Sequence, residues 1–457
     1  MFDMFHSAIT RGWFSAEAVA LWSDRATIEA WMEAEFALAQ AQGELGIIPA
    51  DTAGLMRQHV QVEKFDLESM AREVGTILHP LVPFLHQFEA MCPPDVAGYL
   101  HWGITTQNIF ETGAALQLRN THANIMRDLD RSILELARIA RQHAGTIQAG
   151  RTHGQHAVPV TFGYKLAGWA VELERQKARL DDLSKDALTA HYGGAAGTFG
   201  AMGGRGREVQ ARAAAILGLA PTRVAARSNF DGVASYMAAL GVFAGLIEKM
   251  AGEVSFLQRT EIAEVHERHE YGIVGSSTMA QKRNPTRANN IIGVARLLKA
   301  RVPIIFDSLV RLNDADSVTS NLADVTVPEI AVMAASLAEK WHEVVVGLHV
   351  DEDRMLANFQ LTNGLIMSEA IMMELAPLIG RGSAHHVLYD AVSAVLDKGS
   401  SFEAAIRNHE AVAAAAAKLD ISDLVDPKRY VAEVTDWVHE EAEDLLSGAP
   451  EGDGARR

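Results

Sequence analysis

The sequence predicts an all-α protein of three helical domains, organised around a bundle of long helices. Two observations lead to this prediction. Only 13 prolines occur in 457 residues, and none falls between Pro221 and Pro285. Alternation of Val, Ile and Thr with polar residues, which is typical of half-buried strands, is sparse. Long helices are therefore the main elements that we expect.

Within the proline-free interval, apolar residues recur three or four positions apart, as they do on one face of a helix. They are Val233, Met237, Leu240, Ala244, Ile247, Ala251, Val254 and Leu257. A helix over 231–269 would be about 58 Å long at 1.5 Å per residue. Rods of this length bury their remaining apolar stripes well against further copies of the chain, so the pattern also favours an oligomer.

The same spacing predicts further helices over 109–144 and 160–188, and shorter helices are expected over 285–310 and 328–349. Together the long helices define a central domain over 107–350. An N-terminal helical domain over 1–106 precedes it, and a C-terminal domain of shorter helices over 351–457 follows. The Gly- and charge-rich end of the chain, SGAPEGDGARR, is expected to be disordered.

Charge and composition restrict the possible partners. The formal net charge of −17 argues against nucleic acid, although a local cationic pocket would still admit a small anionic substrate. The single cysteine, Cys92, excludes an intramolecular disulfide and fits a reducing compartment. No apolar run reaches the roughly 18 residues of a membrane span, and the N-terminus lacks a signal-peptide pattern. We therefore expect a soluble, cytoplasmic protein with no membrane partner.

Polar residues gather in three places, of which the first is GSSTMAQKRNP, residues 275–285. Asn284 is a good helix cap, and Pro285 suits a first helical turn. A helix start with free N–H groups and Lys282 beside it also suits an anion, such as the enediolate formed from a carboxylate. The local pattern thus leaves a capped loop and an anion site both open.

The other two clusters adjoin predicted long helices. In GRTHGQH, residues 150–156, two histidines suit proton transfer near neutral pH. A metal site is disfavoured there, because Gly154 separates His153 from His156 and no acidic or thiol partner is adjacent. In HWGITTQN, residues 101–108, four consecutive hydrogen-bonding side chains exceed what helix capping needs, and a carboxylate would fit there.

In this order and spacing, the three clusters resemble the signature regions of the fumarase/aspartase superfamily. They look most like the branch that holds adenylosuccinate lyase and 3-carboxy-cis,cis-muconate cycloisomerase. The resemblance extends to GGAAGTF (193–199), EIAEVHE (261–267) and TNGLIMSE (362–369), so it covers most of the chain. It implies a homotetramer with a twenty-helix core, active sites built from three subunits, and no metal, nucleotide or organic cofactor.

The resemblance also implies roles for individual residues. Ser276 is expected to be the general base that removes a proton from a succinyl substrate. Lys282 and Asn284 would hold the carboxylate that becomes the enediolate. His153 would be the general acid or its organiser, and His79 matches a further active-site histidine. The other expected substrate-binding residues are Thr105, Thr106, Gln107, Asn108, Thr152, Gln155, Ser277, Met279 and Arg283.

Several positions depart from the family pattern. Ala280-Gln281 stands where Pro-x is usual, which removes a rigid turn from the loop, and Asn108 stands where Asp is usual. Gly12-Trp13 appears where adenylosuccinate lyases carry an Arg-Tyr pair. Asp324 replaces an arginine used on the nucleotide and would repel a phosphate. AMP is therefore not expected as the leaving group.

The implied reaction is anti β-elimination from an N-substituted aspartate or a related succinyl compound, releasing fumarate and an amine-type product. Two alternatives stay open. One is a carboxymuconate-type cycloisomerase, which uses similar proton chemistry but closes a lactone. The other is an inactive homologue kept as a structural or binding protein. Ala280, Gln281 and Asn108 favour that alternative, whereas the presence of Ser276 and Lys282 argues against it.

Overall fold

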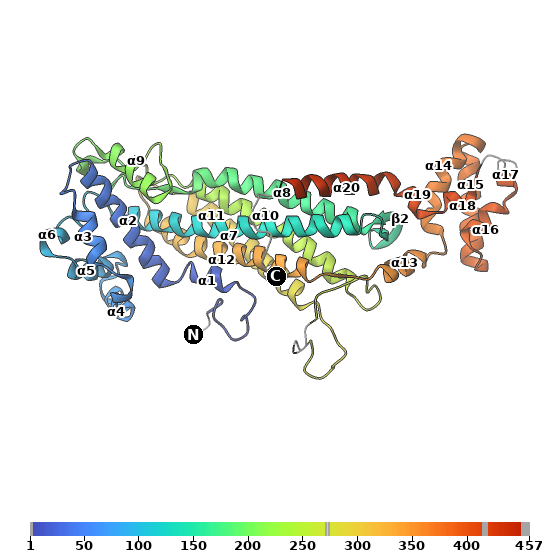
Figure 1. Ribbon diagram of the computed structural model, residues 1–457, viewed down its shortest axis with the longest axis horizontal. Helices are drawn as coiled ribbons and strands as arrows, with labels where there is room; N and C mark the ends of the chain where they lie inside the picture. The colour runs from blue at the N-terminus through green and yellow to red at the C-terminus, as the bar shows by residue number, and fades with distance from the viewer. Residues whose placement is uncertain (1–2, 270–271, 273–274, 414–418, 449–457) are drawn as a thin grey trace. The chain divides into compact units, whose positions relative to one another are not determined.

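Helices dominate the computed structural model, which describes residues 3–269, 272, 275–413 and 419–448 (Figure 1). The chain forms two compact units from interleaved segments. Unit 1 comprises 1–128, 175–248 and 290–340, and unit 2 comprises 129–174, 249–289 and 341–457. The predicted helical fold class is confirmed. The division into three domains at 106 and 350 stays a prediction.

Long helices run through both units. They are α7 (Thr106–Gln142), α8 (Phe162–Ala187), α10 (Asp231–Leu257), α11 (Thr286–Leu309) and α12 (Ser317–Val346). Three of them, α7, α8 and α11, begin and end within three residues of the predicted bounds. Helices α10 and α12 are apolar and long enough to cross a membrane, but 50% and 67% of their most apolar windows are buried, as in core helices.

The predicted bounds of the other two long helices were wrong. Helix α10 ends at Leu257 instead of 269, because the chain turns back there: the Glu264 N–H donates to the Leu257 carbonyl at 2.9 Å, and Ala263 has φ +52°. Helix α12 begins at Ser317, so Pro328 lies inside it rather than at its start. A proline inside a helix removes one hydrogen bond. Burial of neighbours such as Val327 offsets that loss.

Unit 1 also contains a group of helices from the N-terminal half of the sequence. They are α1 (Ala16–Ala20), α2 (Asp24–Glu44), α3 (Thr52–His59), α4 (Leu67–Ile77), α5 (Leu81–Met91), α6 (Pro94–Ala97) and α9 (Gly206–Leu217). Helix α2 contacts both α3 and α9 (Figure 1). Met56, Phe84 and Phe88 are fully buried in the core that α2, α3, α4, α5 and α6 share.

In unit 2, the C-terminal part of the chain forms a second group of short helices. They are α13 (Glu352–Gln360), α14 (Ser368–Ile379), α15 (Arg381–Lys398), α16 (Phe402–Arg407), α17 (Glu410–Ala413), α18 (Ile421–Leu424), α19 (Pro427–Tyr430) and α20 (Ala432–Ser447). Helix α15 packs against α14 and α16. Their core is built from fully buried side chains that include Leu375, Phe402 and Ile406.

Short strands join some of the helices. The longest pair, β1 (Ile147–Thr152) and β2 (Gln155–Thr161), is an antiparallel hairpin in unit 2. The pairs β3 (Thr189–Ala190) with β4 (Ala220–Pro221) and β5 (Val265–His266) with β6 (His349–Val350) have two residues in each strand. The sequence did not predict the hairpin, because Gly150 and Pro159 interrupt the alternation that marks a strand. The pairing is irregular beside Gly150, between Ala149 and Arg151.

A glycine in the GGAAGTF segment of unit 1 gives a test of local packing. Gly197 has φ +76°, and a Cβ there would collide with the backbone of Ala225. We expect Gly197→Ala to lower the free energy of unfolding by about 3 kcal/mol or more. Gly203→Ala is the control, because Gly203 has φ +58° but open space around it, and about 1 kcal/mol is expected. Urea unfolding measures both, and equal losses would contradict this account.

Candidate active site

The HWGITTQN cluster lies at the N-terminal end of α7, in unit 1. His79 follows α4, and its Nε2 lies 3.4 Å from Thr106 Oγ1. Asn108 is buried: its Oδ1 accepts from the N–H groups of Thr105 at 3.1 Å and Gly194 at 3.0 Å. The side chain of Asn108 therefore caps α7 and joins the GGAAGTF segment to it. Its predicted role in binding substrate stays a prediction.

Gln107 is held by a ring of charged groups. Its Nε2 donates to Glu111 Oε1 at 2.6 Å, and its Oε1 accepts from the Arg227 guanidinium. Arg311 Nη1 closes the ring by donating to Glu111 Oε1 at 2.7 Å and to the Arg227 carbonyl at 2.9 Å. The ring fixes the start of α7, the segment before α10 and the segment after α11. It also fixes which end of the Gln107 amide is the donor.

Glu111 has a further neighbour, His191. The His191 Nδ1 lies 3.4 Å from Glu111 Oε2, and that oxygen is buried without a hydrogen-bond partner among the described residues. Burial lowers the pKa of His191, while the nearby Glu111 raises it. The imidazole is thus favoured in its neutral form beside the ring.

A cavity of about 930 Å³ lies within unit 1, and we call it the unit 1 cavity. His79, Thr106 and Gln107 line it, so three of the predicted site residues share one space. Aromatic rings form another part of the lining: Trp31 stacks on Phe110 with 4.8 Å between ring centroids. The cavity therefore combines hydrogen-bonding groups at a helix start with apolar walls, as small-molecule sites do.

Asp324 of α12 also lines the unit 1 cavity. Desolvation by the surrounding protein, with a smaller effect of the negative charge on Glu111, raises the pKa of its carboxyl to about 6, although Arg311 opposes the shift. Among the described residues, no hydrogen bond or ion pair is made by the Asp324 side chain. The predicted repulsion of a phosphate by Asp324 stays a prediction.

The second cluster forms the turn of the β1–β2 hairpin in unit 2. His153 has φ +53° and Gly154 has φ +79°, as in the type I′ turns that join two strands through two residues. Thr152 and Gln155 face each other across this turn, and all four residues are exposed. A histidine in the left-handed region costs about 1 kcal/mol or more, and such strain is common at functional positions.

A buried carboxylate anchors the hairpin. Glu264 is fully buried and accepts from Gln148 Nε2 at 2.7 Å, Asn358 Nδ2 at 2.8 Å and Arg151 Nη1 at 3.1 Å. Burial alone would raise the pKa of Glu264, but these donors together hold it below its ordinary value. Glu264 therefore stays ionised and fixes β1 through Gln148 and Arg151, just before the turn that carries His153.

The third cluster, 275–285, is a loop in unit 2 that leads into α11. The Asn284 Nδ2 donates to the Gly275 carbonyl at 2.7 Å, which joins the two ends of the loop. Ser276 Oγ accepts from the N–H of Met279 at 3.1 Å. Ser277, Met279, Lys282 and Arg283 are exposed. Backbone donors next to Ser276 favour a negatively charged oxygen, as a serine acting as a base requires.

The start of α11 is capped differently from the prediction. The side chain of Glu267 accepts from the N–H groups of Arg287 at 3.1 Å and Ala288 at 2.6 Å. The expectation of free N–H groups at this helix start was therefore wrong, since a carboxylate of the chain itself occupies them. Asn284 closes the loop instead of capping the helix. An anion held by Lys282 and Asn284 would have to bind within the loop.

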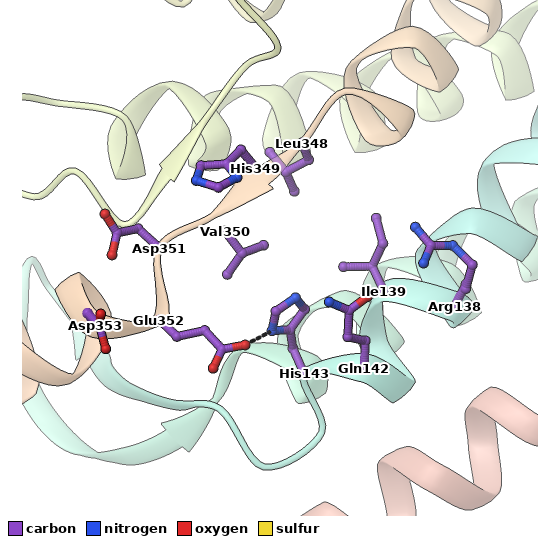
Figure 2. Close-up of a pocket in the computed structure, with 10 residues that line it drawn as sticks. All are labelled: Arg138, Ile139, Gln142, His143, Leu348, His349, Val350, Asp351, Glu352 and Asp353. Atoms are coloured by element: carbon purple, nitrogen blue, oxygen red, sulfur yellow. Dashed lines mark ion pairs between the residues drawn. The ribbon is translucent and has the colours of Figure 1, made fainter.

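Within each unit, the predicted residues are thus only partly brought together. His79, Thr106 and Gln107 share the unit 1 cavity, whereas the hairpin turn and the loop have separate hydrogen-bonding neighbours in unit 2. Unit 2 has a cavity of about 650 Å³ that none of the predicted residues lines. In Figure 2, Glu352 reaches toward His143 there, with 3.0 Å between Oε1 and Nδ1. The described part of the chain contains no group of three or more metal-binding side chains.

Sequence reasoning missed most of the groups around the unit 1 cavity. Arg227, Arg311 and His191 stand in no motif. Arg311 and His191 reach Glu111 from far along the sequence, and Arg227 reaches Gln107. Glu111 itself gave a weak local signal, since it follows Gln107 by one helical turn.

Comparisons with known proteins cover most of the chain. Residues 15–298 match the Lyase family, and residues 364–440 match the adenylosuccinate lyase C-terminus family. The chain is 31% identical to N-acetyl-S-(2-succino)cysteine lyase from Dickeya dadantii, over 93% of each chain. It is 33% identical to 3-carboxy-cis,cis-muconate cycloisomerase from Pseudomonas aeruginosa, over 92% of each.

A solved structure agrees with these relatives. The crystal structure of fumarate lyase from Mesorhizobium sp. BNC1 has a TM-score of 0.86 and 31% identity, covering 96% of this chain and 99% of that one. The chain therefore belongs to the fumarase/aspartase superfamily of lyases. The superfamily inferred from the three sequence clusters is confirmed.

The raised pKa of Asp324 predicts a pH-dependent stability. A carboxyl whose pKa rises from 3.8 to about 6 on folding favours the fold when protonated, so its contribution is present below pH 3.8 and lost as pH rises through about 6. The charged groups Glu111, Arg311, Arg227 and Asp316 line the same cavity. Asp324→Asn should therefore be stabilised relative to wild type at pH 8 but not at pH 4, as measured by urea unfolding. A difference between the two proteins that does not change with pH would contradict the prediction.

Proposed function

We propose that the protein is a lyase that catalyses anti β-elimination from an N-substituted aspartate or a related succinyl compound, releasing fumarate. The observation that carries the proposal is the similarity, over nearly the whole chain, to a lyase named for a 2-succino substrate. The leaving group would be an amine in our proposal. The name of that relative places the succino group on sulfur, so a thiol leaving group belongs to the same test.

The proposed reaction needs a general base, a binding site for the substrate carboxylate and a binding site for the leaving group. Ser276 Oγ would take the proton from the carbon next to one carboxylate, with Lys282 and Asn284 stabilising the resulting enediolate. The bond between the neighbouring carbon and the leaving atom would then break, its electron pair departing with that atom. The C=C bond of fumarate forms, and the leaving group gains a proton in the neighbourhood of His153. Thr105, Thr106, Gln107 and His79 would hold the second carboxylate.

We also propose that the active enzyme is a cytoplasmic homotetramer. The long apolar helices and the superfamily resemblance support an assembly in which the three clusters meet across subunits. Exposed apolar side chains on α11 and α12, among them Phe306, Val318 and Val325, provide surface for such contacts. The single cysteine is compatible with a reducing compartment.

A second candidate function has its own support. The chain is as similar to 3-carboxy-cis,cis-muconate cycloisomerases as to the succino-compound lyase, at 31–33% identity. A cycloisomerase would bind the substrate carboxylate with the same residues. It would then form a bond between a carboxylate oxygen of the substrate and a carbon of the same molecule, which closes a lactone.

One experiment separates the candidates. The purified protein is supplied in turn with N-substituted aspartates, with N-acetyl-S-(2-succino)cysteine and with 3-carboxy-cis,cis-muconate, and fumarate or lactone is followed by ultraviolet absorbance. We expect fumarate from a succinyl compound, and at least about a hundredfold loss of turnover in Ser276→Ala. Thr278→Ala, in the same loop, is the control and should retain activity.

The outcomes are distinct. Lactone without fumarate would establish the cycloisomerase instead. Undiminished turnover in Ser276→Ala, with helicity intact by circular dichroism, would refute the role of Ser276. No turnover of any compound would favour an inactive homologue.

Sharing of the active site between subunits gives a separate prediction. Ser276→Ala and Thr106→Ala should each be inactive alone. If the two positions belong to sites built from different chains, mixed tetramers should recover about a quarter of wild-type activity, since one site in four receives two intact contributions. Co-expression with two different tags, followed by tandem purification and assay, measures this. A tetramer by light scattering with no recovered activity would mean that each chain completes its own site.

A further inference from the structure

The unit 1 cavity is larger than a succinyl group requires. A four-carbon diacid held at His79, Thr106 and Gln107 would leave most of the roughly 930 Å³ unfilled. One face of α12 lines another part of this space through Ser317, Ser320, Asp324 and Pro328, which follow helical spacing. In the proposed reaction, this second part is available to the leaving group.

The two arginines of the cavity are occupied by the protein itself. Arg311 is 2% exposed, donates to Glu111 and to the Arg227 carbonyl, and lies 4.3 Å from the centre of the Phe230 ring. Arg227 donates to Gln107 Oε1 and to the carbonyl of Ala195. Among the described residues, the Nε atoms of both arginines have no partner, and both atoms are buried. The cavity therefore offers a ligand little of its positive charge.

Asp324 is a charged group of the lining that stays open to a ligand. The cavity walls partly desolvate its carboxyl, although the residue as a whole keeps solvent exposure in the lining. The carboxyl makes no hydrogen bond or ion pair with any residue that the structure describes. The Asp324 side chain belongs to the face of α12 that lines the cavity. This part of the cavity suits a hydrogen-bond donor with a positive charge.

The apolar walls favour the same kind of ligand. Trp31 and Phe110, whose rings are stacked at an interplanar angle of 16°, line the cavity together with Trp22. Aromatic faces attract cations and accommodate alkyl chains. A phosphorylated leaving group would meet none of these preferences and would be repelled by ionised Asp324.

We infer that the unit 1 cavity binds the leaving group through a protonated amine, which Asp324 recognises as the specificity-determining residue. The substrate class is an aspartate whose nitrogen carries an alkyl chain ending in an ammonium group. This inference rests on the proposed function, because it assigns the part of the substrate that departs. Asp324 is mostly ionised at neutral pH, as its pKa of about 6 allows, and an ammonium partner would stabilise the ionised form further.

The test compares two substrates of matched length. N-(3-aminopropyl)aspartate ends in an ammonium group, and N-butylaspartate ends in a methyl group. For the wild-type protein we expect kcat/KM for fumarate release to be at least about tenfold higher with the aminopropyl compound. Asp324→Asn keeps the size of the side chain and removes the charge. This substitution should lower kcat/KM for the aminopropyl compound about tenfold, while changing kcat/KM for the butyl compound by less than about twofold.

Asp316→Asn is the matched control variant. Asp316 also lines the cavity, but its carboxylate already accepts from the N–H of Val318 at 2.8 Å. The preference for the aminopropyl compound should survive this substitution. The inference would be overturned if Asp324→Asn lowered kcat/KM equally for both substrates, or if the wild-type protein preferred the butyl compound.

A binding measurement keeps the inference separate from the proposed function. If no succinyl compound yields fumarate, the proposed function fails, and the cavity is then tested with 1,3-diaminopropane and butylamine as probes in the presence of fumarate. Saturation-transfer NMR should show the diamine bound by wild type and by Asp316→Asn, and bound at least about tenfold more weakly by Asp324→Asn. No binding of the diamine, or binding that Asp324→Asn leaves unchanged, would overturn the inference.

Discussion

In each unit, a carboxylate paired with an arginine joins segments where the helices give way to irregular chain; Glu264 is fully buried and Glu111 is partly buried. Glu111 does this in unit 1 by binding Arg311 and Gln107, and Glu264 does it in unit 2 by binding Arg151 and Asn358. Desolvating an unpaired carboxylate would be costly, so each depends on the donors that pair with it. Segments that are far apart in sequence are thereby fixed to the long helices, and they carry the candidate functional residues.

This arrangement separates rigid support from reactive groups. Thr106 and Gln107 stand on the first turn of a long helix, so the position of a bound carboxylate is set by the bundle. His153 instead lies in an exposed hairpin turn, and Ser276 lies in a loop whose neighbouring residues are exposed. For the proposed elimination, such a division is useful: the substrate is held by fixed groups, while the proton-transfer groups sit on segments with room to adjust.

Local sequence signals accounted for the long helices and for where the polar clusters begin. The bounds predicted for α7, α8 and α11 agree with the structure to within three residues. Periodicity failed where a tertiary contact overrode it: α10 ends early because the chain folds back onto Leu257, and α12 continues through Pro328 because its flanking residues are buried.

The candidate site was only partly predictable for a related reason. Thr106 and His79 were found because they belong to motifs, yet nothing local to Arg227, Arg311 or Glu267 indicates which distant group each of them meets. Glu267 shows the limit clearly. Its carboxylate caps a helix that starts after an intervening loop, and no spacing rule connects the two.

The hydrogen bond between Asn284 and the Gly275 carbonyl has a consequence for the energetics of ligand binding. A loop with free ends loses conformational entropy when a ligand orders it, and this loss subtracts from affinity. Here the two ends of the segment that carries Ser276 are already joined. Part of that entropy is therefore lost during folding, and a ligand would have to order only the tip of the loop.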